Sequence, residues 1–326
     1  MSSPPLAERL PRGCGFWGCA SVLMAVMAMV IGLGVFVVWV QQDQDVVASA
    51  EGIPLGTIPY YTAPDSPARY TFINIGQGPF QRRVDIIVPA DPVPGERLPM
   101  VVVLHGHSAN SELVRLNGGW DIQVAKHRFI ALLPNGIGES WNAGNCCRPA
   151  MTLGMDDVAF IDSAISDMAK RPEVDPARVF MVGESNGGMM TYRYLCDHAD
   201  RIVAAASVIG TNVSGCEPSR ALPFLHVAGT SDEVVPYGGG SSAPGRVLAG
   251  GDFPPARDTI SALAAAQGCA APTSTVDGIV ETVTYAPCSD GSRVEFATIT
   301  GLTHVWPRGE PYDASSEVVS FFGLDR

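Results

Sequence analysis

Residues 178–192 read R-V-F-M-V-G-E-S-N-G-G-M-M-T-Y and carry the strongest structural signal in this chain. The apolar run at 179–182 leads into the pattern G-x-S-x-G, and apolar residues at helical spacing follow it. A Cβ at Gly183 or Gly187 would collide with neighbouring backbone in the tight turn that this pattern forms. The segment therefore predicts a nucleophile elbow, a strand-to-helix turn that presents Ser185.

A serine hydroxyl becomes a good nucleophile when a histidine takes its proton and a carboxylate orients that histidine. In folds with this elbow, the acid comes next along the chain and the histidine comes last. Asp232 follows the strand-like run 223–228 and is the expected acid, with Glu233 as the fallback. His304 is the only histidine after that point. The order predicts a triad of Ser185, Asp232 and His304, although Asp232 alone is also typical of a turn and His304 of a packed core.

An oxyanion also needs hydrogen-bond donors that are fixed before the reaction begins. The segment 100–107, M-V-V-V-L-H-G-H, is strand-like and ends where one such donor usually lies. We expect the backbone N–H groups of His107 and Asn186 to form the oxyanion hole. The side chains of His105 and His107 are interpreted as loop-shaping groups. Asn186 is expected to contribute only a main-chain N–H, which any residue could supply.

Strand-like and helix-like segments alternate along the chain. A stripe of apolar residues at spacings of 3, 4 and 3 predicts a helix over 158–168, and further helices are expected at 257–267 and 313–322. This alternation predicts a mostly parallel sheet with helices on both faces. Together with the nucleophile elbow and the order of the triad, it leads us to expect an α/β-hydrolase fold with no large cap domain. The strand candidates are 70–75, 82–88, 100–104, 129–133, 178–182, 203–209, 223–228 and 293–299.

Two loops are expected near Ser185. The first, 139–149, reads E-S-W-N-A-G-N-C-C-R-P, and its Trp141 and Asn142 are expected near the substrate. The second, 237–255, is too rich in glycine and proline to predict regular structure. It is either a mobile rim over the cleft or a surface insertion without a role.

The composition limits the possible partners. A chain of 326 residues with 46% apolar composition can bury one large core, so one catalytic domain is expected. The net charge is −12, and Lys126 and Lys170 are the only lysines. Because no basic stripe could bind phosphate backbones, nucleic acid is not an expected partner.

A long apolar run lies near the N-terminus. Residues 16–40 carry no charge and are long enough to cross a bilayer of about 30 Å as a helix. Arginines precede the run and aspartates follow it, which predicts that residues 1–15 are cytoplasmic and that the rest is outside. Residues 41–69 lack periodicity and predict a linker, followed by the catalytic domain at 70–326.

A cleaved signal peptide is the competing interpretation of this run. Ala48-Ser49-Ala50 has the small-x-small form of a cleavage site, which would release a secreted enzyme after Ala50. The run is much longer than a signal core, and polar residues separate it from the site. The sequence therefore favours a membrane anchor, and under either interpretation the enzyme works outside the cytoplasm.

Six of the eight cysteines follow the apolar run, and an even number in an oxidising compartment predicts disulfides. Cys269 with Cys288 is the preferred pair, because they flank one strand-like excursion. Adjacent Cys146 and Cys147 are not expected to bridge each other. A metal site is the alternative, but ligand spacing for one is lacking. The six cysteines are Cys146, Cys147, Cys196, Cys216, Cys269 and Cys288.

These motifs together resemble those of the polyhydroxybutyrate depolymerase and feruloyl esterase group of α/β-hydrolases, including related lipoprotein esterases. The resemblance spans roughly residues 70–321 and is far more specific than the elbow alone. It rests on L-H-G (104–106), W-N-A-G-N-C-C (141–147), D-D-V-A-F-I (156–161), G-E-S-N-G-G-M-M (183–190), G-T-S-D-E-V-V-P-Y-G-G (229–239) and H-V-W-P (304–307).

The resemblance implies a serine esterase that hydrolyses carboxylic esters through an acyl-enzyme, with feruloyl, acetyl or short hydroxyalkanoate acyl groups. Ser185 would be the nucleophile and His304 the general base and then the general acid, with Asp232 orienting His304. Trp306 is expected beside the histidine as an aromatic wall for the acyl group, with packing against the sheet edge as the alternative. No cofactor or metal ion is implied.

Two other functions use the same residues. An acyltransferase would pass the acyl group to a sugar or lipid hydroxyl, and the triad cannot distinguish this from hydrolysis. A non-catalytic protein of this fold is a third possibility, which the complete triad in the proper order disfavours. The chain ends at Arg326 without the polymer-binding domain of extracellular depolymerases, so degradation of an insoluble polyester is not expected. Neither Cys14 nor Cys19 lies in a lipobox.

Overall fold

The N-terminal expectations cannot be compared with the structure. The expected cytoplasmic segment 1–15 and membrane helix 16–40 lie outside the described residues, as does most of the linker 41–69. Among the helices that are described, none is both long and apolar enough to span a bilayer. The computed structural model describes residues 55, 60, 66–76 and 81–325.

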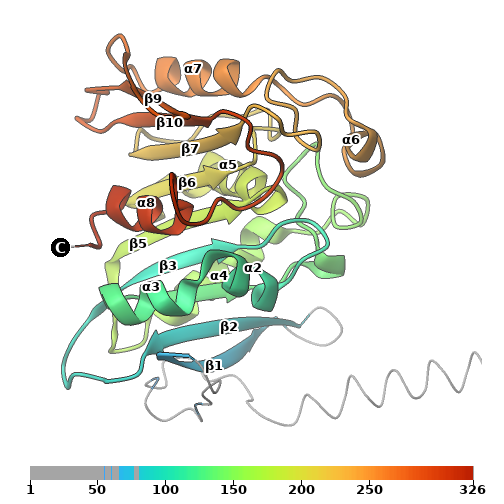
Figure 1. Cartoon of the computed structure of the whole chain (residues 1–326). Coiled ribbons are helices and arrows are strands. Elements are labelled where there is room, and N and C mark those ends of the chain that lie inside the picture. Colours follow the sequence, from blue (N-terminus) through green and yellow to red (C-terminus); the bar gives the residue numbers. More distant parts are fainter. Residues whose placement is uncertain (1–54, 56–59, 61–65, 77–80, 326) are drawn as a thin grey trace, which may run out of the picture. The chain divides into compact units, whose positions relative to one another are not determined.

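One ten-stranded sheet runs through the described part of the chain (Figure 1). Its strands are β1 (Ala68–Ile75), β2 (Arg82–Pro89), β3 (Leu98–Leu104), β4 (Ile130–Pro134), β5 (Val174–Glu184), β6 (Ala204–Val208), β7 (Phe224–Gly229), β8 (Thr273–Asp277), β9 (Val280–Tyr285) and β10 (Val294–Ile299). Their order is β1-β2-β4-β3-β5-β6-β7-β10-β9-β8. The six central strands, β4-β3-β5-β6-β7-β10, are parallel to one another. The two strands at each edge pair antiparallel with their neighbours.

The eight strands predicted from the sequence all occur, whereas β8 and β9 were not predicted. β8 is exposed along its whole length, and β9 buries only Val280 and Val283. These two strands form an antiparallel hairpin at the sheet edge. A hairpin at the sheet edge is exposed to solvent, so its sequence lacks the continuous run of apolar residues by which a buried strand is recognised.

Helices cover both faces of the sheet (Figure 1). The helices on one face contribute Val114, Trp120 and Val318 to one hydrophobic core. The helices on the other face contribute Ile161 and Leu263 to a second core. The predicted α/β-hydrolase architecture is therefore confirmed. The first group is α2 (Ser111–Gly118), α3 (Trp120–His127) and α8 (Ala314–Phe321); the second is α4 (Asp157–Ala169), α5 (Asn186–His198) and α7 (Ala256–Ala266).

Three disulfides link the six cysteines of the described region. Cys269–Cys288 confirms the preferred pair, and Cys196 pairs with Cys216. The expectation for the adjacent pair was wrong, because Cys146 and Cys147 are bonded to each other. The expectation rested on the unfavourable local geometry of a bridge between adjacent residues. In the structure the peptide bond between them is cis and their Cα atoms are 3.0 Å apart.

Candidate active site

Ser185 occupies the turn between β5 and α5, where the sequence predicted a nucleophile elbow. Its backbone has φ 52° and ψ −115°, a conformation that a residue other than glycine rarely adopts. A Cβ at Gly183 would lie 2.1 Å from the carbonyl carbon of Gly187. A Cβ at Gly187 would lie 2.2 Å from the carbonyl oxygen of Leu104. Both glycines are therefore required by close backbone packing, as the pattern predicted.

The structure brings Ser185, His304 and Asp232 into one hydrogen-bonded row. His304 Nδ1–H donates to Asp232 Oδ2 at 2.7 Å, and the Ser185 hydroxyl lies 2.9 Å from His304 Nε2. Because a carboxylate only accepts, Nδ1 carries the proton of a neutral imidazole and Nε2 is free to accept the serine proton. The three residues follow β5, β7 and β10, whose carboxyl ends meet at one edge of the sheet. Glu233 is exposed and takes no part in the row.

The Asp232 carboxylate is fixed by backbone as well as by His304. Its Oδ1 accepts hydrogen bonds from the N–H groups of Val234 and Val235, both at 2.8 Å. The side chain is 3% exposed, whereas that of His304 is 18% exposed. One carboxylate oxygen thus accepts hydrogen bonds from the loop backbone, and the other accepts one from the imidazole. A carboxylate held in this way fixes the tautomer and orientation of the histidine.

The two expected oxyanion-hole donors are both free to bind an incoming group. Within the described residues, neither the His107 N–H nor the Asn186 N–H donates a hydrogen bond to the protein. Asn186 is the first residue of α5, where N–H groups lack a partner inside the helix. The loop that contains Gly106 lies beside Ser185, since a Cβ built at Gly106 would be in ordinary van der Waals contact with Ser185 Cβ, at 3.5 Å.

The rings of His105 and His107 hold loops, which fits the role that the sequence suggested. His105 Nδ1–H donates to the Gly106 carbonyl at 2.8 Å, and its Nε2 accepts from the Gly136 N–H at 2.9 Å. Burial lowers the pKa of His105 to about 4, so the ring is neutral at pH 7. His107 Nε2–H donates to the Arg148 carbonyl at 2.9 Å.

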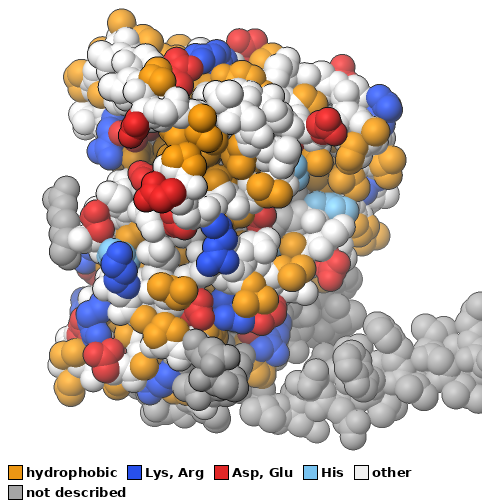
Figure 2. Space-filling view, viewed as in Figure 1, with side chains coloured by type: hydrophobic (Ala, Val, Ile, Leu, Met, Phe, Trp, Pro, Cys, Tyr) orange, Lys and Arg blue, Asp and Glu red, His pale blue; other side chains and the backbone are white. Residues whose placement is uncertain are grey.

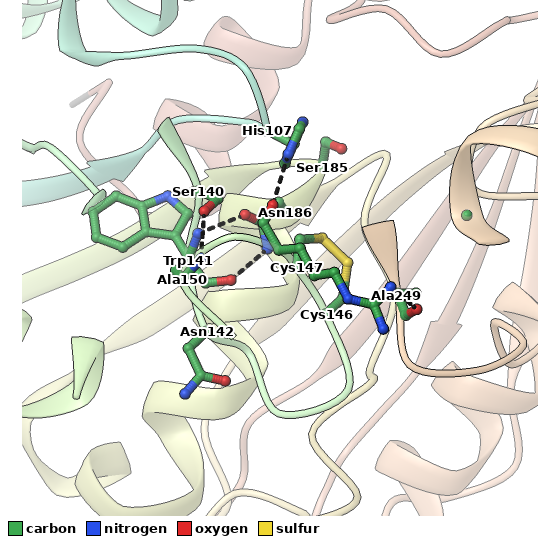
Figure 3. The surroundings of a disulfide bond; sticks show 12 residues. His107, Ser140, Trp141, Asn142, Cys146, Cys147, Ala150, Ser185, Asn186 and Ala249 are labelled. Carbon is green, nitrogen blue, oxygen red and sulfur yellow. Dashed lines mark hydrogen bonds between the residues drawn. A yellow bond between two sulfur atoms is a disulfide. The ribbon is translucent and has the colours of Figure 1, made fainter. Parts of the chain in front are cut away.

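The side chain of Asn186 has a function that the sequence analysis missed. Its Oδ1 accepts from the Trp141 N–H at 2.7 Å, and its Nδ2 donates to the Trp141 carbonyl at 3.1 Å (Figure 3). Asn186 is 1% exposed. The expectation that any residue could stand here was wrong, since only a side-chain amide supplies both a donor and an acceptor in this geometry. Trp141 is 45 residues away in the chain, so no local pattern could have revealed the pair.

The three residues expected near the substrate make contacts within the protein. Trp141 is fully buried, stacks on Phe160 and donates its indole N–H to the His105 carbonyl at 2.9 Å. Asn142 Nδ2 donates to the Met155 carbonyl at 2.9 Å, and Figure 3 shows this side chain pointing away from Ser185.

Trp306 fits the packing alternative rather than the aromatic wall. It is 6% exposed and lies edge-on to Trp120, with 6.0 Å between ring centroids. Its indole N–H donates to the Ser315 hydroxyl at 3.1 Å. The indole therefore fixes the segment after His304 against the helix layer.

Glu184 is a buried acid beside the nucleophile that the sequence analysis did not single out. Burial raises its pKa above the ordinary value, and the amide of Asn117 and the charge of His304 act in the opposite direction. The Asn117 Nδ2 lies 3.5 Å from both carboxylate oxygens, which is a weak contact. Glu184 is the variable position before the serine in G-x-S-x-G, so the motif gives no information about it.

The second loop, 237–255, is more ordered than its composition predicted. It contains the short helix α6 (Ala243–Leu248), so the expectation of no regular structure was wrong. Ser242 begins the helix by accepting the Gly245 N–H on its hydroxyl at 2.9 Å. A serine cap with a proline in the first helical turn, here Pro244, favours a helix start, which outweighs the neighbouring glycines.

The two loops are joined to each other. The Gly250 N–H donates to the Asn145 carbonyl at 2.8 Å, and the Arg148 guanidinium donates to the Val247 carbonyl at 2.8 Å. Val247, in the second loop, is exposed. Figure 2 shows hydrophobic side chains gathered over α6 beside histidine atoms. The second loop is therefore held against the first loop by hydrogen bonds.

The fold is that of an α/β-hydrolase, and it brings a serine, a histidine and an aspartate together at one edge of the sheet. The acetyl xylan esterase from Aspergillus awamori has the same fold, with a TM-score of 0.58 and 17% identity over 78% of this chain and 99% of that one. No family model matches the chain. The structural likeness is a likeness of fold.

Sequence relatives narrow this class. The "Putative esterase NocK" of Nocardia uniformis subsp. tsuyamanensis is 29% identical over 241 residues, which are 69% of this chain and 70% of that protein. Feruloyl esterase B of Piromyces equi is 34% identical over 177 residues. The match covers 52% of this chain but only 31% of the Piromyces protein. The chain is thus similar in sequence to esterases, has the α/β-hydrolase fold and is a carboxylic ester hydrolase.

Proposed function

We propose that this esterase works through an acyl-enzyme on Ser185, with His304 as proton carrier and Asp232 as its orienting acid. The observation that carries the proposal is the row of two hydrogen bonds, at 2.7 and 2.9 Å, that joins the three side chains. The free N–H groups of His107 and Asn186 support an oxyanion hole on the same side.

In acylation, Ser185 Oγ attacks the ester carbonyl carbon and its proton passes to His304 Nε2. The carbonyl oxygen becomes the oxyanion and accepts hydrogen bonds from the His107 and Asn186 N–H groups. The tetrahedral intermediate then collapses, the bond to the alcohol oxygen breaks, and His304 gives its proton to the leaving alcohol. Asp232 stays ionised and stabilises the imidazolium that forms between these transfers.

Deacylation repeats these steps with water. His304 Nε2 takes a proton from water, the hydroxide oxygen attacks the acyl carbon, and the same N–H groups bind the second oxyanion. The carboxylic acid leaves when His304 returns the proton to Ser185 Oγ. Each cycle consumes one ester and one water and releases one alcohol and one acid.

The acyl group is proposed to be acetyl, hydroxycinnamoyl or a short hydroxyalkanoate, esterified to a sugar or another soluble alcohol. Support comes from relatives named feruloyl esterase B, above, and bifunctional acetylxylan esterase/xylanase XynS20E of Neocallimastix patriciarum, which is 29% identical over 157 residues. The chain spans 22% of the latter protein.

The place of action is proposed to be outside the cytoplasm. Three disulfides in the described region support an oxidising compartment. A membrane anchor at residues 16–40, with a chain cleaved after Ala50 as the alternative, rests on the sequence alone. Fractionation of expressing cells and N-terminal sequencing of the product distinguish the two.

The test compares hydrolysis of p-nitrophenyl acetate, p-nitrophenyl butyrate and methyl ferulate by the full chain and by Ser185→Ala. We expect loss of turnover in the variant while its circular dichroism is unchanged. The ranking of the three substrates reports whether the site prefers an aryl or an alkyl acyl group. If an added alcohol yields more transfer product than free acid, the protein is an acyltransferase instead. A Ser185→Ala variant as active as the wild type overturns the proposal.

A further inference from the structure

One short loop contacts both residues of the proposed oxyanion hole. The loop, residues 139–150, contains the Cys146–Cys147 disulfide, and Figure 3 shows it between His107, Asn186 and Ala249. We infer that this disulfide is a positioning element, which holds the loop so that the His107 and Asn186 N–H groups point at the oxyanion. The inference deepens the proposed function and rests on its assignment of these two donors.

The first connection runs from the disulfide through Trp141 to Asn186. The Cys147 N–H donates to the Trp141 carbonyl at 2.8 Å. The same carbonyl accepts Asn186 Nδ2–H at 3.1 Å, and the Trp141 N–H donates to Asn186 Oδ1 at 2.7 Å. The Cys146 carbonyl accepts the Ala143 N–H, which closes the loop from the other side. A shift of Cys147 therefore moves the group that fixes the Asn186 side chain.

The second connection runs from the disulfide through Arg148 to His107. Arg148 is bonded directly to Cys147 in the chain, and its carbonyl accepts His107 Nε2–H at 2.9 Å. The His107 N–H is the other proposed donor. The loop thus contacts each donor residue through one side chain, on opposite sides of the disulfide.

The second loop supports the disulfide from outside. Cys146 forms an antiparallel bridge with Ala249, and the Arg148 N–H donates to the Leu248 carbonyl at 3.0 Å. Cys146 is 1% and Cys147 3% exposed. Because the sulfur atoms are buried, the disulfide acts through the backbone that it holds and not by touching substrate.

The expected effect is large because an oxyanion hole works only when its donors are fixed before the reaction. Removing one donor typically costs about 10²–10³ in kcat. Displacement by about 1 Å can cost on the order of 10². Loosening a loop that holds two donors should therefore lower kcat while substrate binding, measured as KM, changes little.

The experiment uses the full chain with Cys146→Ala/Cys147→Ala, and Cys269→Ala/Cys288→Ala as the matched control. The control removes a disulfide near the edge hairpin, away from the triad. The readouts are kcat and KM for p-nitrophenyl acetate, the melting temperature, and the inhibition constant of phenylboronic acid. A boronate forms a tetrahedral adduct with the serine and places an oxygen in the oxyanion hole, so its affinity reports the hole and not the fold.

For the Cys146/Cys147 variant we expect kcat to fall about 10- to 100-fold, with KM little changed and boronate binding weakened by a similar factor. The control should melt at a lower temperature with wild-type kcat. A folded Cys146/Cys147 variant with wild-type kcat and boronate affinity overturns the inference. So does an equal loss of kcat in the control, because the effect would then be general destabilisation.

Two further variants keep the test decisive if the double variant fails to fold. Asn186→Ala removes one connection and keeps the backbone N–H, and His107→Phe removes the other in the same way. Each should lower kcat and weaken boronate binding with little change in KM, and wild-type values in both overturn the inference. Ser185→Ala separates the two proposals: turnover in Ser185→Ala defeats the proposed function. An inactive Ser185→Ala beside a fully active Cys146/Cys147 variant defeats the positioning role alone.

Discussion

His304 and Asp232 meet through a single 2.7 Å hydrogen bond, and the second oxygen of Asp232 is held by two backbone N–H groups. The carboxylate therefore cannot rotate without losing contacts with its own loop. The imidazole is fixed with Nδ1 protonated and Nε2 facing Ser185. The order along the chain and the geometry in space agree on the same three residues.

Replacing Asp232 by asparagine should lower kcat for p-nitrophenyl acetate by about 10³–10⁴-fold. The amide can present an N–H where the carboxylate accepted one, which favours the wrong histidine tautomer. Glu233→Gln is the matched control, because Glu233 is adjacent, acidic and exposed. Steady-state kinetics of both variants check this, and a larger loss in the Glu233 variant would reverse the assignment of the acid.

Gly187→Ala should destabilise the fold, because its Cβ would lie 2.2 Å from the Leu104 carbonyl oxygen. We expect the free energy of unfolding in urea to fall by about 2–4 kcal/mol. At Gly238, by contrast, an added Cβ meets no atom within 4 Å. Gly238→Ala should therefore unfold like the wild type. Equal stability of all three proteins would show that the elbow tolerates a side chain.

His226 predicts a loss of stability at acidic pH. It is fully buried, and burial lowers its pKa to about 3. In the unfolded chain the pKa of this histidine is about 6.5. Below that pH the unfolded chain binds a proton at His226 that the folded protein does not bind, so stability falls as pH falls toward 3. Between pH 7 and pH 5 this single group should cost about 2 kcal/mol.

The variant His226→Gln isolates that contribution. Urea unfolding at pH 7 and pH 5 should show a smaller loss in the variant than in the wild type, by about 2 kcal/mol. The variant has its own offset at pH 7, since the hydroxyl of Tyr192 loses its 2.8 Å partner at Nδ1. Only the change with pH is diagnostic, and the same change in both proteins would contradict the prediction.

Trp306→Phe should change stability more than substrate choice. The indole packs on Trp120 and donates to Ser315, so its loss should lower the free energy of unfolding by about 1–3 kcal/mol. The ratio of kcat/KM for methyl ferulate to that for p-nitrophenyl acetate should stay as in the wild type. A selective loss on methyl ferulate would restore the aromatic wall that the sequence suggested.

The predictable parts of this molecule were those with a local pattern or a fixed order. Gly183, Gly187 and the apolar run before Ser185 predicted the elbow, and strand order then limited the acid and histidine to a few positions. Buried strands were predicted because their apolar runs are continuous, as in β3, whose residues are all buried. The edge hairpin of β8 and β9 lacked that signal.

Contacts between distant loops were not predictable. Nothing near Asn186 in the sequence indicates that its amide pairs with Trp141, and nothing near Cys146 indicates a cis peptide. Trp141 was expected near the substrate because its loop follows a strand of the sheet that carries Ser185, and Trp306 because the family resemblance placed it beside His304. The fold uses both as buried supports instead. The positions of these side chains depend on how several distant segments pack together.

The most direct test of the central claim is to trap the acyl-enzyme. Wild-type protein mixed with p-nitrophenyl acetate is quenched in acid within the first turnover, digested and examined by mass spectrometry. The account predicts one acetyl group on the peptide containing Ser185, and none on the corresponding peptide of Ser185→Ala. An acetyl group on another residue, or full turnover by Ser185→Ala, would contradict it.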